Sequence, residues 1–269
     1  MLVFPNAKIN IGLNIVEKRS DGFHNITSCF YPVVWSDALE IIPAKNFSFH
    51  SDGTAIPGKA VDNLCIKAFQ MLAADYTLPP VSIHLLKTIP IGAGLGGGSS
   101  DAAFTITALN RLFDLEISLE KQQDYARRLG SDCAFFIENK AVFAFEKGDY
   151  FEPIDLSLKG KWIVMINPGI HISTIEAYSG VKPGKPESDL RNLLKEPIAS
   201  WKSTIKNDFE VTILKKYPLL EKIKQNLYDS GAAYAAMSGS GSTLYGIFEE
   251  EIDLSDQFQR FNIWQGILM

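Results

Sequence analysis

The sequence has few cysteines, few histidines and no excess of positive charge. Three cysteines are too few and too scattered for a disulfide framework or a C-x-x-C zinc site, so we expect buried, reduced thiols of the kind found in the cytoplasm. The four histidines show no metal-ligand spacing. A net charge of −5 over 269 residues argues against a general nucleic-acid binder, which needs a basic face.

Long apolar runs and a targeting segment are also missing. The first residues, MLVFPNAKINIGLNIV, lack a basic start and a small-residue cleavage site, and Lys8 and three asparagines interrupt them. We interpret them as a first strand and loop. The sequence therefore predicts a cytoplasmic protein, with no nucleic acid and no membrane among its partners. The net charge does not exclude an anionic small molecule, because a pocket can be locally positive.

The remaining sequence mixes helical and strand patterns. Apolar residues at helical spacing predict helices over 62–76, 99–113, 118–130 and 218–231, and residues 81–86 alternate as a strand does. Residues 162–168 form a continuous apolar run, typical of a strand buried on both faces. Few strands resemble parallel-sheet cores, which favours an α+β class. A polar bridge at 151–161 predicts two domains, 1–152 and 153–269.

A glycine-rich segment, PIGAGLGGGSSDAA (Pro90 to Ala103), lies between a strand and a helix. Glycine lacks the Cβ that would hold a backbone away from a bulky anion, and the helix start adds free N–H groups. The segment predicts a phosphate-binding loop, with a flexible surface loop as the alternative. No Lys-Ser or Lys-Thr follows the glycines, which excludes a Walker A loop. A G-x-G-x-x-G match exists, but no strand leads directly into it, so a dinucleotide-binding dehydrogenase is only a weak alternative.

Four other features could carry chemistry. Lys8 and Asn10 are two residues apart on a predicted strand and share one face, which is open either to solvent or to a cleft. Asp132 precedes an apolar run, so it caps a helix or accepts a hydroxyl proton. The segment MSGSGST (Met237 to Thr243) is either a tight hairpin or a backbone that approaches a ligand closely. His24 follows a Ser-Asp-Gly turn beside Phe23, where a base could stack or an ordinary hairpin could turn.

Taken together, these segments resemble the GHMP kinases. The loop PIGAGLGGGSSDAA is similar to that superfamily's glycine-rich motif, and MSGSGST is similar to its C-terminal motif. The segments NAKINIGLNIVEKRSDGFHNI, LGSDCAFFI and NDFE resemble the members that act on 4-diphosphocytidyl-2-C-methyl-D-erythritol in the non-mevalonate route to isoprenoids. The resemblance implies a two-domain GHMP kinase fold with an active-site cleft between the domains. It also implies transfer of the ATP γ-phosphoryl group to the 2-hydroxyl of the acceptor, with Mg²⁺ on the ATP phosphates.

The resemblance assigns roles residue by residue. Asp132 is the base or hydroxyl-orienting acid, and Lys8 keeps it ionised and stabilises the transferred group. The ATP-binding residues lie in one loop: Pro90, Gly92, Gly94, Leu95, Gly96, Gly97, Gly98, Ser99 and Ser100. The substrate-binding residues come from four segments: Asn10, Phe23, His24, Thr174, Tyr178, Ser238, Gly239 and Ser240. The metal ligands cannot be assigned from the sequence, and we expect a monomer or weak homodimer.

The sequence departs from the family pattern at three positions. Phe23 stands where tyrosine is more frequent, Asp101 stands where asparagine is common, and Glu146 replaces a glycine. Two alternatives stay open within the resemblance. One is a related kinase for mevalonate or homoserine. The other is a nucleotide-binding protein without activity, which the presence of both Lys8 and Asp132 argues against.

Overall fold

The computed structural model describes residues 1–269, which fall into two compact units that alternate along the chain. The first unit comprises Met1–Ala7, Trp35–Ile91 and Gly96–Lys140. The second comprises Lys8–Val34, Gly92–Leu95 and Ala141–Met269. These units are defined by packing in space, so the division into 1–152 and 153–269 stays a prediction.

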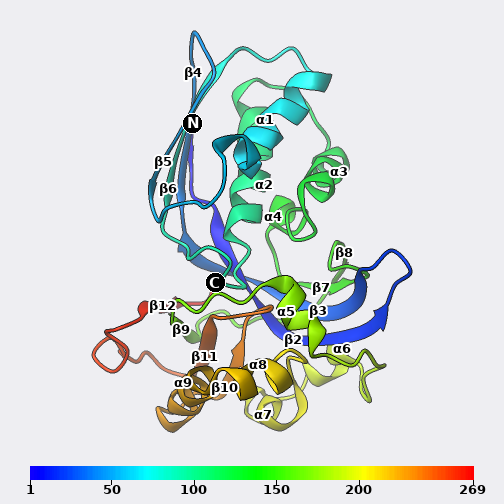
Figure 1. Cartoon of the computed structure of the whole chain (residues 1–269), viewed down its shortest axis with the longest axis vertical. Helices are drawn as coiled ribbons and strands as arrows, with labels where there is room; N and C mark the ends of the chain where they lie inside the picture. The colour runs from blue at the N-terminus through cyan, green and yellow to red at the C-terminus, as the bar shows by residue number, and fades with distance from the viewer. The chain divides into compact units, whose positions relative to one another are not determined.

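The first unit is a four-stranded sheet with helices on one face (Figure 1). Its strands, in spatial order, are β1 (Leu2–Val3), β4 (Ala38–Pro43), β6 (Val81–Lys87) and β5 (Ser48–Gly53). β4 pairs antiparallel with β6, whereas β5 pairs parallel with it. The predicted alternation on β6 is confirmed, because Val81, Ile83 and Leu85 are buried while His84 and Leu86 are exposed. One face of the sheet is thus a core face.

The helices of this unit largely match their predicted positions. They are η1 (Ala60–Asp62), α1 (Leu64–Asp75), α2 (Gly97–Leu112), α3 (Leu119–Leu129) and α4 (Phe135–Glu138). Ser118 caps α3 and Gly130 ends it, as expected. The expected serine cap of α2 is wrong, because α2 begins at Gly97 with Gly96 as its N-cap. Gly96 has a φ of +70°, a conformation that glycine adopts without strain.

The second unit holds two more four-stranded sheets. One has the order β2 (Asn6–Lys18), β3 (His24–Ser36), β7 (Val142–Phe145) and β8 (Tyr150–Pro153). The other has the order β10 (Tyr234–Met237), β11 (Leu244–Phe248), β9 (Trp162–Asn167) and β12 (Asn262–Ile267). All pairs in the second sheet are antiparallel, and β9 is buried from Ile163 to Asn167 as the apolar run predicts.

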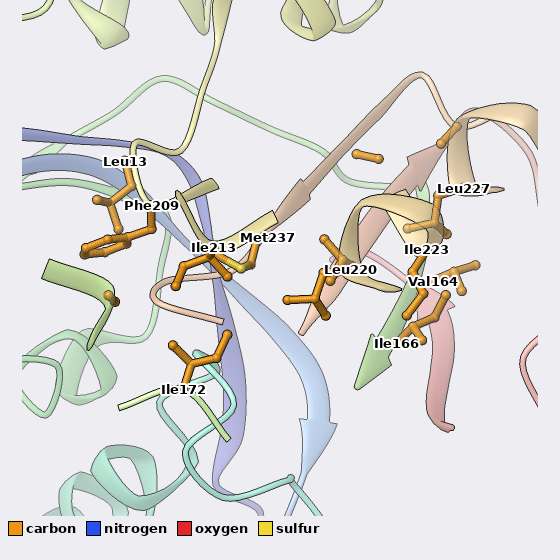
Figure 2. Close-up of a cluster of buried hydrophobic side chains, with 14 of the residues drawn as sticks. Leu13, Val164, Ile166, Ile172, Phe209, Ile213, Leu220, Ile223, Leu227 and Met237 are labelled. Atoms are coloured by element: carbon orange, nitrogen blue, oxygen red, sulfur yellow. The ribbon is translucent and has the colours of Figure 1, made fainter. Parts of the chain in front are cut away.

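Helices and an apolar core complete the second unit. Its helices are α5 (Thr174–Ser179), α6 (Leu190–Leu193), η2 (Ile198–Ser200), α7 (Trp201–Thr204), α8 (Glu210–Lys216) and α9 (Pro218–Asp229). Figure 2 shows side chains of α8 and α9, among them Ile213 and Leu220, in one buried cluster with Ile166 of β9. This cluster also includes Met237, so the core fixes the residue at which the small-residue turn begins. None of the helices is long and apolar enough to cross a membrane.

Candidate functional site

Three carbonyl groups of the glycine loop accept hydrogen bonds from other parts of the chain. The carbonyl oxygens of Ala93, Gly94 and Leu95 accept hydrogen bonds from Thr243 N (3.3 Å), Ser238 Oγ (2.8 Å) and Lys8 N (3.0 Å). These acceptors lie on three consecutive residues, so the backbone of the loop is held along one side.

The N–H groups of the same loop are left available. No hydrogen bond is donated by the N–H groups of residues 92–99, and the helix ladder starts with Ser100 N to Gly96 O. Gly92, Gly94 and Gly96 all have positive φ, between +63° and +79°, so the chain bends repeatedly just before a 16-residue helix whose first N–H groups have no partner within the protein. Such an arrangement binds anions, phosphate above all.

Lys8 and Asn10 lie on β2 and are buried. Lys8 Nζ donates to Asn10 Oδ1 at 2.5 Å, and it lies 4.6 Å from the centroid of the Phe30 ring. Asn10 Nδ2 donates to Ser28 Oγ at 2.9 Å. The alternative of a solvent-exposed lysine is therefore wrong, since Lys8 is only 3% exposed. A buried lysine held by an amide and an aromatic ring keeps one fixed position.

The small-residue turn after β10 lies against the glycine loop. Ser238 is fully buried, and an added Cβ on Gly239 would lie 3.2 Å from Gly94 Cα. Gly239 and Gly241 have positive φ values of +55° and +89°. The turn is thus a close approach of two backbones, and Ser240 is its half-buried tip.

Two residues that sequence reasoning did not assign hold this turn in place. Asn207 Nδ2 donates to Met237 O and to Gly239 O, each at 2.8 Å, and Glu210 Oε1 accepts from Met237 N at 2.7 Å. In the sequence, the only signal for these two residues was the motif NDFE. Nothing in its spacing indicated contact with a turn about thirty residues later.

Asp132 lies in the turn that precedes α4 and is half-buried. The helix-cap interpretation is wrong, because the N-cap of α4 is Ala134 and makes no side-chain cap hydrogen bond. Its neighbour Cys133 is buried, and burial raises the pKa of that thiol to about 12.

The residues predicted to bind a base come together in part. The rings of His24 and Tyr178 stack with centroids 4.4 Å apart and an interplanar angle of 19°. Burial, and more weakly the charge of Lys18, lowers the pKa of His24. Phe23 is more than half exposed, and Lys147 Nζ lies 5.4 Å from its ring centroid. Thr174 begins α5 one turn before Tyr178 and is exposed.

The turn that carries Phe23 and His24 is tied to the β7–β8 turn. Arg19 NH1 donates to Glu146 Oε2 at 2.5 Å and to Asn25 Oδ1 at 2.9 Å. Glu146 has a φ of +56°, a conformation that favours glycine, so its ion pair with Arg19 accompanies a strained backbone. This left-handed φ explains why the family pattern has a glycine at the position of Glu146.

Comparison with known proteins agrees with this geometry. The family model described as GHMP kinases N terminal domain matches residues 63–140, and the model described as GHMP kinases C terminal matches residues 189–263. A curated protein of Cytophaga hutchinsonii, named 4-diphosphocytidyl-2-C-methyl-D-erythritol kinase, is 55% identical over 92% of each chain. The chain belongs to the GHMP kinase family. A protein of the same name from Bacteroides fragilis is 49% identical over 93% of each chain.

Solved structures show the GHMP kinase fold over the whole chain. A crystal structure of 4-(cytidine 5'-diphospho)-2C-methyl-D-erythritol kinase matches with a TM-score of 0.84 at 29% identity, covering 99% of this chain and 98% of that one. The Methanococcus jannaschii mevalonate kinase matches with a TM-score of 0.73 at 14% identity, over 100% and 98%. The second match concerns the fold alone. As a GHMP kinase, the chain has the expected two-domain, mixed helix and sheet architecture.

Proposed function

We propose that this GHMP kinase transfers the γ-phosphoryl group of ATP to the 2-hydroxyl of 4-diphosphocytidyl-2-C-methyl-D-erythritol, a step in isoprenoid precursor synthesis. Near-full-length relatives carry the name of that kinase. The observation in the structure that carries the proposal is the glycine loop, whose carbonyls are held while its N–H groups stay available for phosphate oxygens.

Catalysis follows from positioning and charge. Phosphoryl transfer needs little covalent help from the protein, so fixed donors and a correctly placed base supply most of the rate. We assign the ATP phosphates to the N–H groups of the loop from Gly94 to Ser100. Asp132 accepts the proton of the acceptor hydroxyl as its oxygen attacks the γ-phosphorus, and ADP leaves. Lys8 supplies positive charge for the transferred group.

Magnesium enters this proposal with the nucleotide. The structure has no group of three or more histidine, cysteine or acidic side chains that could hold a metal. That fits an ion carried mainly by phosphate oxygens and water, as is usual for Mg²⁺ in kinases. The chain offers the hydroxyl of Ser100, which is buried and has no hydrogen-bond partner. Bound there, the ion would neutralise phosphate charge.

The cytidine end of the acceptor is assigned to Phe23, His24, Thr174 and Tyr178. A neutral imidazole can both donate and accept a hydrogen bond, as recognition of a base edge requires. The lowered pKa of His24 keeps its ring neutral at pH 7. The aromatic rings offer stacking surfaces. Asn10, Ser238, Gly239 and Ser240 are assigned to the methylerythritol part.

One assay tests the function. ADP release is measured with ATP and Mg²⁺ over a panel of acceptor alcohols: 4-diphosphocytidyl-2-C-methyl-D-erythritol, mevalonate and homoserine. We expect turnover only with the first. Turnover of mevalonate or homoserine alone would show that the chain phosphorylates a different substrate of the same family. ADP release at the same rate with no acceptor present would contradict kinase activity.

Two variants test the catalytic roles. Asp132→Asn and Lys8→Met should each lower kcat by at least about a hundredfold, the usual contribution of a general base or a fixed charge. Nucleotide binding, measured by calorimetry, should persist. Asp124→Asn, an exposed carboxylate on α3, is the matched control. Normal activity of Asp132→Asn would remove Asp132 from the mechanism.

We also propose that the enzyme works in the cytoplasm. Its three cysteines are free and buried, which suits a reducing compartment. The expectation of a monomer or weak homodimer stays a prediction, which gel filtration with light scattering tests directly.

A further inference from the structure

The glycine loop offers N–H groups to phosphate but has no lysine of its own. No lysine follows its glycines in the sequence, as one does in a Walker A loop. Lys87 Nζ would lie 2.9 Å from an added Cβ on Gly97, at the start of α2. This ammonium group is already paired with two buried carboxylates, those of Asp37 and Asp101. A triphosphate on the loop therefore gains little from Lys87, and other donors around the loop matter more.

One histidine lies against this loop. An added Cβ on Gly92 would lie 3.6 Å from Nδ1 and 3.7 Å from Cε1 of His171, so an edge of the imidazole ring faces the first glycine of the loop. His171 is exposed, and its ring makes no hydrogen bond or ion pair within the protein. A ring with both nitrogens unpaired, beside a row of unpaired N–H groups, is available to a ligand bound at the loop.

The backbone on both sides of His171 is anchored. Ile170 O accepts from the buried Ser242 Oγ at 2.6 Å. Ile172 is only 3% exposed and belongs to the buried cluster that Figure 2 shows, together with Met237. Two fixed neighbours therefore set the position from which the exposed ring of His171 extends.

The small-residue turn that anchors the backbone beside His171 also holds the loop. Its last residue, Thr243, donates through its N–H to Ala93 O at 3.3 Å. Asn167 Nδ2 donates to Thr243 Oγ1, and Asn167 Oδ1 accepts from Gly169 N, each at 3.0 Å. The chain that leaves β9 is thus fixed to the same turn. The histidine and residues 92–95 of the loop belong to one compact unit and are held by one turn.

We propose that His171 is a further phosphate-binding residue of this chain, whose ring N–H donates a hydrogen bond to a phosphoryl oxygen of the ATP on the glycine loop. The inference rests on the proposed function, because it needs ATP phosphates at this loop. Either tautomer of a neutral imidazole has one N–H donor, so the contact does not need a protonated ring. Hydrogen bonds to a charged oxygen are stronger than those to a neutral one. His171 therefore adds to the affinity for the triphosphate and not for the nucleoside.

Calorimetry with two ligands tests the proposal. The Mg²⁺ complex of a non-hydrolysable ATP analogue and, separately, CDP are titrated into the full chain. We expect His171→Ala to bind the analogue about tenfold more weakly than the wild type, the effect of losing one hydrogen bond to a charged group. Its affinity for CDP should equal that of the wild type. His50→Ala, which removes an exposed histidine on β5, is the matched control and should bind both ligands normally.

Nuclear magnetic resonance of the wild type gives a second readout, which does not depend on the folding of a variant. The chain has four histidines, so the ring signals are few and can be assigned. The His171 signals should shift when the ATP analogue is added and stay unchanged with adenosine, which has no phosphate. The His50 signals should respond to neither ligand.

The outcomes are distinct. Equal affinity of His171→Ala and the wild type for the analogue, an equal loss of affinity for CDP, or the same shift of the His171 signals with adenosine would overturn the inference. Weaker binding of CDP alone would assign His171 to the acceptor and would overturn it as well. If the wild type binds no ATP analogue at all, the proposed function fails. If the wild type binds the analogue and His171→Ala binds it equally, only the inference fails.

Discussion

Asn10 and Ser238 are 228 positions apart, yet the backbone N–H of Asn10 donates to the Ser238 hydroxyl at 3.3 Å. That hydroxyl in turn donates to Gly94 O at 2.8 Å. One buried hydroxyl therefore connects strand β2, the glycine loop and the small-residue turn. The part of the chain proposed to bind phosphate is thus held by a residue from the far end of the sequence.

Removing this hydroxyl should loosen the loop. Ser238→Ala leaves Gly94 O and Asn10 N without their partner in a buried place, which costs about 1–3 kcal/mol of the free energy of unfolding. Urea denaturation measures the loss. Ser203→Ala, an exposed serine on α7, is the control and should change stability by less than about 0.5 kcal/mol. Equal losses in the two variants would show that the hydrogen bonds of the Ser238 hydroxyl add nothing particular to the free energy of unfolding.

Two glycines of the same loop should respond in opposite ways to alanine. An added Cβ on Gly94 would lie 1.9 Å from Ser238 O, and Gly94 has a φ of +79°. An added Cβ on Gly98 would meet nothing within 4 Å, and Gly98 is helical. We expect Gly94→Ala to unfold readily or to lose nucleotide binding, and Gly98→Ala to keep or raise the melting temperature. A stable Gly94→Ala protein that binds ATP normally would contradict the close packing described here.

Cytidine binding should depend on the charge of His24. Its lowered pKa means that the folded protein holds the imidazole proton less tightly than the unfolded chain does. The neutral ring is therefore the stable folded form above pH 6.5, and protonation opposes folding and removes the acceptor nitrogen as the pH falls below that value. We expect the affinity for CDP to fall below pH 6.5 and His24→Ala to bind weakly at every pH. Thermal shift with CDP measures both effects. Tight binding of CDP by His24→Ala would show that the cytosine base does not bind at His24.

The stability of the free protein should report the protonation of Asp101. Burial raises its pKa, so the folded state binds this proton more tightly than the unfolded chain, and the stabilisation is lost as the pH rises through about 7. The melting temperature of the wild type should therefore drop more between pH 6 and pH 8.5 than that of Asp101→Asn. Glu120→Gln, which changes an exposed acid in the first turn of α3, should follow the wild type. Parallel curves for the wild type and Asp101→Asn would mean that Asp101 does not titrate in this range.

Local patterns in the sequence were sufficient for most individual elements. The alternation in 81–86, the apolar run in 162–168 and the Ser118 cap each depend on neighbouring residues only, and each is found where it was predicted. The start of α2 was misplaced because the serines there resemble caps, whereas the left-handed Gly96 starts the helix two residues earlier than expected. Local preference could not decide between these two starts.

The sequence by itself determined the chemistry of the glycine loop, since absent side chains and positive φ are properties of glycine wherever it stands. Only the tertiary structure decided that Lys8 is buried, that Asn207 and Glu210 hold the turn after β10, and that Asp101 faces Lys87 and Asp37. Burial and pairing arise when segments far apart in the chain pack together. No local pattern contains that information. For this reason the sequence alone could not explain an aspartate at position 101, where the family pattern commonly has asparagine.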